Sequence, residues 1–177
     1  MILELAYYGD PVLRKKGQPV EKIDDDVKKL VADMIETMEA RNGIGLAAPQ
    51  VFHSLNIFII RIPEPGPNKT MLPGDLCVFI NPKILSVGEN TCIMEEGCLS
   101  IPKIYEDVER PIEVTIEAQD ADGNTFTETF NGYQARAILH ENDHINGVLF
   151  IDRIRGKKRQ DLEPLLREIK KKYFKKK

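Results

Sequence analysis

Hydrophobic residues recur at the spacing of an amphipathic helix in three stretches of the chain. The first, residues 27–38, follows an acidic stretch that can cap a helix and ends before Asn42-Gly43, a pair typical of helix ends. The second covers residues 133–146 and ends at a glycine. In the third, near the C-terminus, we expect Pro164 to lie in the first turn, where proline is tolerated. The apolar positions of this third helix are Leu162, Leu165, Leu166, Ile169 and Tyr173.

Four shorter stretches have the β-branched content or the alternation of β-strands, and they are residues 56–62, 77–80, 112–118 and 125–130. The proline- and glycine-rich residues 63–74 separate the first two, which predicts a surface loop. Asp122-Gly123 separates the last two, which predicts a hairpin. Because the strands are grouped between helices, we expect an α+β fold with mostly antiparallel pairing. Without repeats or a linker, residues 1–177 should form a single domain, of which residues 160–177 form a basic C-terminal helix.

The composition is that of an ordinary globular protein, with 42% hydrophobic and 30% charged residues. No apolar run approaches the ~18 residues of a membrane span, and residues 1–16 lack the pattern of a secretion signal. We therefore expect a cytoplasmic protein that does not bind a membrane. Three cysteines, an odd number, fit metal or thiol chemistry better than a disulfide framework.

The strongest chemical signal is the His-Glu-x-x-His pattern of residues 140–144, in the second predicted helix. Residues four apart share a helix face, so His140 and His144 can bind one metal ion while Glu141 reaches a water molecule on that ion. Ala137 lies on the same stripe of the helix. The alternative is that the two histidines and the glutamate only bond to one another, but three histidines seldom form this pattern by chance.

A catalytic metal site usually has three protein ligands and one open position. The extended metalloprotease pattern would place a histidine six residues after His144, but that residue is Phe150. Glu163 and Glu168, which could replace it, lie in the basic C-terminal helix and are poorly placed. His53 has no motif around it, and we expect it on the surface or in packing.

A cysteine is the remaining choice for the third ligand. Cys98 is favoured because Gly97 allows close approach of the backbone and Glu96 can orient a neighbouring group. Cys77 lies in an apolar run, where cysteine usually acts as a small hydrophobic residue, and Cys92 has no catalytic neighbours. The residues alone leave these two cysteines as open alternatives.

Three segments resemble, in the same order, the three signature motifs of the peptide deformylases, and they are residues 43–50 (GIGLAAPQ), 95–100 (EEGCLS) and 140–144 (HENDH). The resemblance extends over nearly the whole chain and includes a C-terminal helix like that of the bacterial subclass. It implies an α+β fold in which antiparallel strands surround a central metal-binding helix. The chain departs from the family in its long 63–74 segment and at Arg136, where an apolar residue often lies near the methionine pocket.

The resemblance implies a metal-dependent hydrolase that removes the N-formyl group from the N-terminal formyl-methionine of newly synthesised polypeptides and releases formate. Cys98, His140 and His144 would hold one divalent metal ion. The family characteristically uses Fe²⁺ in this place, although Zn²⁺, Ni²⁺ or Co²⁺ can substitute for it.

The resemblance also implies roles for the neighbouring residues. Glu141 would accept and return the proton, while the side-chain amide of Gln50 and the backbone N–H of Leu99 would stabilise the oxyanion. Glu96 and Arg110 would form a supporting ion pair that orients the site.

The substrate peptide would pair as an added strand with the backbone near Ile44 and Gly45. Tyr133 and Ala137 would contribute to the pocket that receives methionine. We expect no nucleotide ligand, because residues 43–45 are not followed by the third glycine or the Lys-Ser/Thr pair of a phosphate-binding loop.

Charge is concentrated at the C-terminus, where residues 155–177 carry 11 of the 25 basic residues and a net charge of +8. This basic helix could bind ribosomal RNA near the emerging substrate, or its lysines could simply face water. Two other functions remain open, a metallopeptidase that cuts internal peptide bonds and an RNA-binding module without enzymatic activity.

Overall fold

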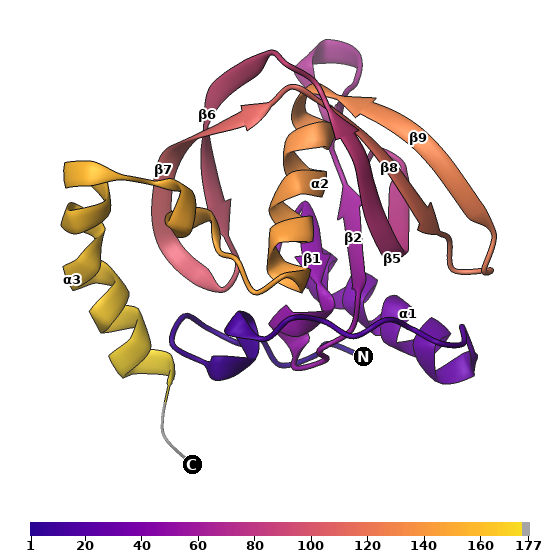
Figure 1. The fold of residues 1–177 in the computed structure, drawn as a ribbon, viewed down its shortest axis with the longest axis horizontal. Coiled ribbons are helices and arrows are strands. Elements are labelled where there is room, and N and C mark those ends of the chain that lie inside the picture. Colours follow the sequence, from indigo (N-terminus) through magenta and orange to yellow (C-terminus); the bar gives the residue numbers. More distant parts are fainter. Residues whose placement is uncertain (175–177) are drawn as a thin grey trace.

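The computed structural model, which describes residues 1–174, contains three α-helices and a set of antiparallel strands, with one helix in the centre of the molecule (Figure 1). The helices are α1 (Asp25–Ala40), α2 (Gly132–Ile145) and α3 (Gly156–Tyr173). Four short 3₁₀ helices are Pro11–Arg14, Ala48–Val51, Pro67–Lys69 and Phe150–Arg153. The cap predicted for α1 is confirmed, because the Asp24 carboxylate accepts a hydrogen bond from the Val27 N–H at 3.1 Å. None of the helices in residues 1–174 is long and apolar enough to span a membrane.

The main sheet has five antiparallel strands in the order β1-β2-β5-β8-β9. Their bounds are Gly45–Ala47 (β1), Ile57–Arg61 (β2), Leu76–Val87 (β5), Glu113–Gln119 (β8) and Thr125–Asn131 (β9). The four predicted strands are thus confirmed, although β5 continues well past its predicted end. A bulge between Ile80 and Lys83 accommodates Asn81-Pro82, a pair that would otherwise end a strand, and a second irregularity follows between Ile84 and Ser86.

A second, two-stranded sheet is formed by β6 (Thr91–Cys98) and β7 (Ile101–Pro111), which the sequence did not predict. The segment predicted as a loop, residues 63–74, is exposed as expected but contains a small hairpin. Its strands are β3 (Glu64–Pro65) and β4 (Met71–Leu72).

Helix α2 lies between the five-stranded sheet and the β6–β7 hairpin, while α1 crosses beneath the sheet (Figure 1). The apolar α2 residues Ala135, Ile138 and Ile145 pack into a core with the sheet residues Phe58 and Phe79. The opposite side of α2 therefore faces the hairpin, and this is the side that carries the His-Glu-x-x-His residues. The expected architecture, a central helix surrounded by antiparallel strands, is confirmed.

The C-terminal helix differs from the prediction in three respects. It begins at Gly156, before the predicted residue 160, so Pro164 lies in its interior and not in its first turn. Because proline has no N–H, the Gln160 carbonyl loses its helical partner, but both residues are exposed and water can bond this oxygen. Leu165, predicted on the apolar face, is 48% exposed. Residues 175–177 of the predicted basic helix lie outside the described residues.

Candidate active site

Helix α2 and strand β6 bring together three side chains that could hold a metal ion. His140 and His144 lie one turn apart on α2, and Cys98 is the last residue of β6. Cys98 Sγ lies 3.2 Å from His144 Nε2, and the ligand atoms of all three residues lie within 4.8 Å of one another. Within residues 1–174, this is the one group of this kind that could hold a metal ion. Cys77 and Cys92, the alternatives that the sequence left open, are not part of it.

The carboxylate of Glu96 fixes the orientation of His140. Oε1 of Glu96 lies 2.7 Å from His140 Nδ1, and Arg110 donates to both carboxylate oxygens at 2.6 and 2.9 Å. Burial raises the pKa of Glu96, but the hydrogen bonds from His140 and Arg110 outweigh it and lower the pKa to about 2. Because an ionised carboxylate only accepts, His140 Nδ1 carries the hydrogen and Nε2 is left to bind a metal.

The electrostatics of the group favour a cation. Burial lowers the pKa of His140, but hydrogen bonds to Cys98 and Glu96 outweigh it and raise the pKa to about 10, so positive charge is favoured here. Burial lowers the pKa of His144 well below its usual value, and its neutral ring is the form that binds metals. The donor set and its charge thus fit a divalent ion.

Glu141 lines a cavity beside these three residues, and only 5% of its surface is exposed. Burial raises the pKa of its carboxyl group to about 7. Gly45 on β1 makes room for this side chain, because a Cβ atom there would lie 3.0 Å from both Cγ and Cδ of Glu141. A carboxyl group with a pKa near neutrality is suited to accept and return protons.

The side-chain amide of Gln50 lies beside Cys98 in a defined orientation. Its Oε1 accepts a hydrogen bond from the Ala47 N–H at 2.9 Å, so its NH₂ group must face the other way. That group lies 3.1 Å from Ser100 Oγ and 3.5 Å from Cys98 Sγ. Leu99, in the turn that joins β6 to β7, follows Cys98 and lines the same cavity.

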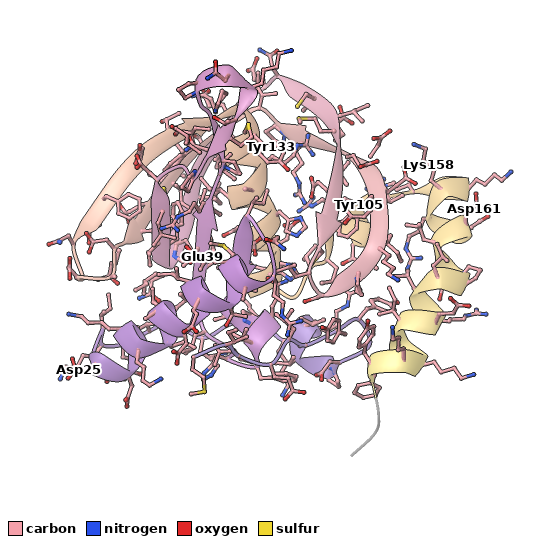
Figure 2. All side chains as sticks on the ribbon, turned by 180° about the vertical axis from the view of Figure 1, so that it is seen from behind. Asp25, Glu39, Tyr105, Tyr133, Lys158 and Asp161 are labelled. Atoms are coloured by element: carbon pink, nitrogen blue, oxygen red, sulfur yellow. The ribbon has the colours of Figure 1, made fainter. Side chains whose placement is uncertain are left out.

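A cavity of about 520 Å³ opens beside this group of three residues. Of the predicted site residues, it is lined by Ile44, Gly45, Gln50, Glu96, Cys98, Leu99, Tyr133, Ala137, His140 and Glu141. His144 and Arg110 are buried behind its wall. Tyr133 of α2 and Tyr105 of β7 also line the cavity, and Figure 2 shows both on the same face of the molecule.

The residues that we set aside as ligands lie elsewhere. Glu163 forms an ion pair with Arg159 on α3, and His53 is exposed, as predicted. Phe150, which replaces the third histidine of the protease pattern, is buried with its ring centroid 5.9 Å from that of His140. It packs against the site without supplying a ligand.

The sequence did not indicate that Ser100, Asp143 and Arg136 belong to the hydrogen-bond network of the site. Ser100 contacts Gln50, and Asp143 accepts hydrogen bonds from Arg110 at 3.0 Å and from Arg153 at 2.6 and 2.7 Å. Arg136 was noted only as a departure from the family, yet it is buried and bonded to Glu96. The sequence did contain a signal for Arg136, because a charged residue on a helix that is expected to be central requires a partner of opposite charge.

The chain is similar to known proteins over nearly its whole length. Residues 2–160 match the family model described as polypeptide deformylase. A peptide deformylase of Pseudothermotoga lettingae is 44% identical over 96% of this chain and 92% of its own length. The solved peptide deformylase of Ehrlichia chaffeensis is 34% identical with a TM-score of 0.88, covering 97% of both chains. A class I type b peptide deformylase from Acinetobacter baumannii, solved with Met-Ala-Ser bound, is 35% identical with a TM-score of 0.80, covering 87% of this chain and 99% of its own. The chain therefore belongs to the polypeptide deformylase family.

Proposed function

We propose that this protein removes the N-formyl group from the formyl-methionine of newly synthesised polypeptides by metal-dependent hydrolysis and releases formate. The observation that carries this proposal is the Cys98, His140 and His144 group beside Glu141 at the wall of one cavity. The Acinetobacter baumannii relative, with Met-Ala-Ser bound, supports a peptide substrate that begins with methionine.

We infer that Cys98, His140 and His144 hold one divalent ion, natively Fe²⁺, and that Zn²⁺, Ni²⁺ or Co²⁺ can replace it. When bound, such an ion lowers the pKa of a water molecule and polarises a carbonyl group. A Cys/His/His set suits several first-row metals, so their supply in the cytoplasm decides among them. If iron is native, aerobic purification should lose activity that Ni²⁺ or Co²⁺ restores.

Glu141 moves the proton in this proposal. It accepts a proton from the water that attacks the formyl carbon, and it donates a proton to the amine when the C–N bond breaks. Burial in the cavity gives Glu141 a pKa of about 7, so both protonation states are accessible near neutral pH. The products are formate and a peptide with a free N-terminal amine.

Negative charge develops on the formyl oxygen during the attack, and two hydrogen-bond donors are available to stabilise it. The NH₂ group of Gln50 is held toward Cys98, because the other end of the amide accepts from the Ala47 N–H. The backbone N–H of Leu99 is the second proposed donor. Since Gln50 is already oriented before the reaction, little reorganisation is needed when the charge develops.

The substrate backbone has an open strand edge to pair with. Among the described residues, β1 pairs only with β2, and the Ile44 carbonyl accepts from the Arg61 N–H at 2.9 Å. Backbone groups alternate in direction along an antiparallel strand, so the N–H and C=O of Gly45 point to the open edge. A peptide that adds there as a strand would place its first side chain beside Tyr133 and Ala137.

We also propose that α3 contacts the ribosome, where the substrate emerges. Leu162, Leu166 and Ile169 bury one face of α3 against the domain, while Lys171 and Lys172 are exposed. A lysine-rich exposed face attracts RNA phosphates and would raise the local concentration of substrate.

One assay separates the proposed function from its rivals. The metal-loaded protein is incubated with formyl-Met-Ala-Ser, with unformylated Met-Ala-Ser, and with a longer peptide that is cut internally by metallopeptidases. We expect formate from the first substrate and no cleavage of the others. Internal cleavage without formate would indicate a metallopeptidase, and no reaction with any substrate would favour a binding module.

A further inference from the structure

Arg136 is buried at the candidate active site, and the proposed reaction assigns it no role. It lies one turn before His140 on α2, lines the cavity and is only 3% exposed. A buried guanidinium beside a pocket that receives methionine is costly unless its charge and donors are satisfied. Its contacts therefore indicate what it does.

The guanidinium of Arg136 joins α2 to both strands of the β6–β7 hairpin. Nη1 donates to Glu96 Oε2 at 2.7 Å and to the Val108 carbonyl at 2.9 Å. Nη2 donates to the Cys92 carbonyl at 2.8 Å. Glu96 and Cys92 belong to β6 and Val108 belongs to β7, so one side chain ties three segments together.

Neutralising Glu96 does not require Arg136. Arg110 already binds both oxygens of this carboxylate, and a second guanidinium on the same oxygen adds repulsion between like charges. The backbone carbonyls that Arg136 also binds offset that repulsion. What Arg136 adds is therefore geometric, because it holds the hairpin that ends in Cys98 against the helix that carries the two histidines.

We propose that Arg136 is a positioning residue for the metal centre, a clamp between α2 and the β6–β7 hairpin that holds Cys98 and the Glu96-bound His140 in one preformed set of ligands. The proposal rests on the proposed function only in requiring that the site binds a divalent ion. Arg136 also acts through Glu96, because Glu96 accepts a hydrogen bond from His140 Nδ1 and thereby directs His140 Nε2 toward the ion.

The test compares Arg136→Met and Arg136→Lys with Arg153→Met as a control. Arg153 donates to Asp143 at 2.6 and 2.7 Å, so it belongs to the same ion-pair network but does not bind Glu96. The affinity for Co²⁺ is measured by competition with a chelator, and the sulfur-to-cobalt absorption band reports whether Cys98 is bound. Circular dichroism and thermal melting show whether each variant is folded.

We expect Arg136→Met to weaken Co²⁺ binding by about 10- to 100-fold, the usual effect of removing a group that orients a ligand. Arg136→Lys should lose less, because an ammonium group can still bond Glu96 but cannot bind both backbone carbonyls. Arg153→Met should bind Co²⁺ like the wild-type protein. At saturating Co²⁺, Arg136→Lys should lower kcat for formyl-Met-Ala-Ser and change KM by less than ~3-fold. If Arg136→Met does not fold, the Arg136→Lys comparison decides the question.

Two results would overturn the proposal. Unchanged Co²⁺ affinity in the folded Arg136 variants, with a raised KM, would make Arg136 a wall of the pocket and nothing more. Equal weakening in Arg153→Met would point to a general loss of packing. Failure of the proposed function would give a different result. In that case the wild-type protein would bind Co²⁺ without releasing formate, and the Arg136 variants would still bind Co²⁺ more weakly than the wild-type protein.

Discussion

Replacing Gly45 by alanine tests how closely β1 and Glu141 approach each other. The added Cβ atom would overlap Oε1 of Glu141 and lie 3.0 Å from its Cγ and Cδ, whereas non-bonded carbon atoms prefer about 3.5 to 4.0 Å. Because β1 is paired with β2 and cannot easily retreat, the carboxylate must move by roughly 1 Å. A displacement of this size at a proton-transferring group costs about 100-fold in rate.

The assay is kcat/KM for formyl-Met-Ala-Ser with the metal content of each preparation measured alongside. Gly45→Ala should lower kcat/KM by about 100-fold while retaining its metal, since none of the three ligands is touched. The melting temperature should fall little, because the end of a flexible side chain can rotate away. Gly88→Ala is a suitable control, because a Cβ atom there would lie 3.1 Å from Cβ of Glu113 and neither residue lines the cavity. Activity of Gly45→Ala within ~2-fold of wild type, or equal loss of metal, would refute the reasoning.

Three further variants test separate parts of the account. Glu141→Gln should lower kcat by at least ~100-fold and keep the metal bound, because it removes the proton acceptor and no ligand; equal loss of metal would contradict that role. Cys98→Ser should lose metal during dialysis against a mild chelator whereas Cys92→Ser should not, and the opposite order would overturn the ligand assignment. The double variant Lys171→Glu/Lys172→Glu should turn over a short formyl peptide normally but co-sediment less with ribosomes at low salt. Undiminished co-sedimentation would refute docking through α3.

The elements that the sequence predicted correctly are those whose buried side chains are apolar and regularly spaced. Helices α1 and α2 and the β8–β9 hairpin belong to this class. Strands β6 and β7 escaped prediction because their buried positions include Glu96 and Arg110, which pair only with each other and with distant residues. A strand that buries an ion pair shows no hydrophobic alternation, so its pattern resembles that of a loop.

In the candidate site, too, the sequence predicted contacts between residues close together in the chain and missed contacts between residues far apart in it. The four-residue spacing of His140 and His144 was enough to place both on one face of a helix. The residues beside Cys98 favoured it as the third ligand, but they left Cys77 and Cys92 open until the resemblance was considered, since nothing in local spacing connects β6 with α2. Arg136 bonds a residue 40 positions away, and only the folded chain brings such partners together.

The most direct test of the central claim is the dependence of formate release on bound metal. The protein is stripped of metal with a chelator, titrated with Co²⁺ or Ni²⁺ under anaerobic conditions, and assayed for formate from formyl-Met-Ala-Ser. We predict no formate from the stripped protein and a rate that rises in proportion to bound metal until one ion is present per chain. Formate release by the metal-free protein, or none when one ion is bound per chain, would contradict the account.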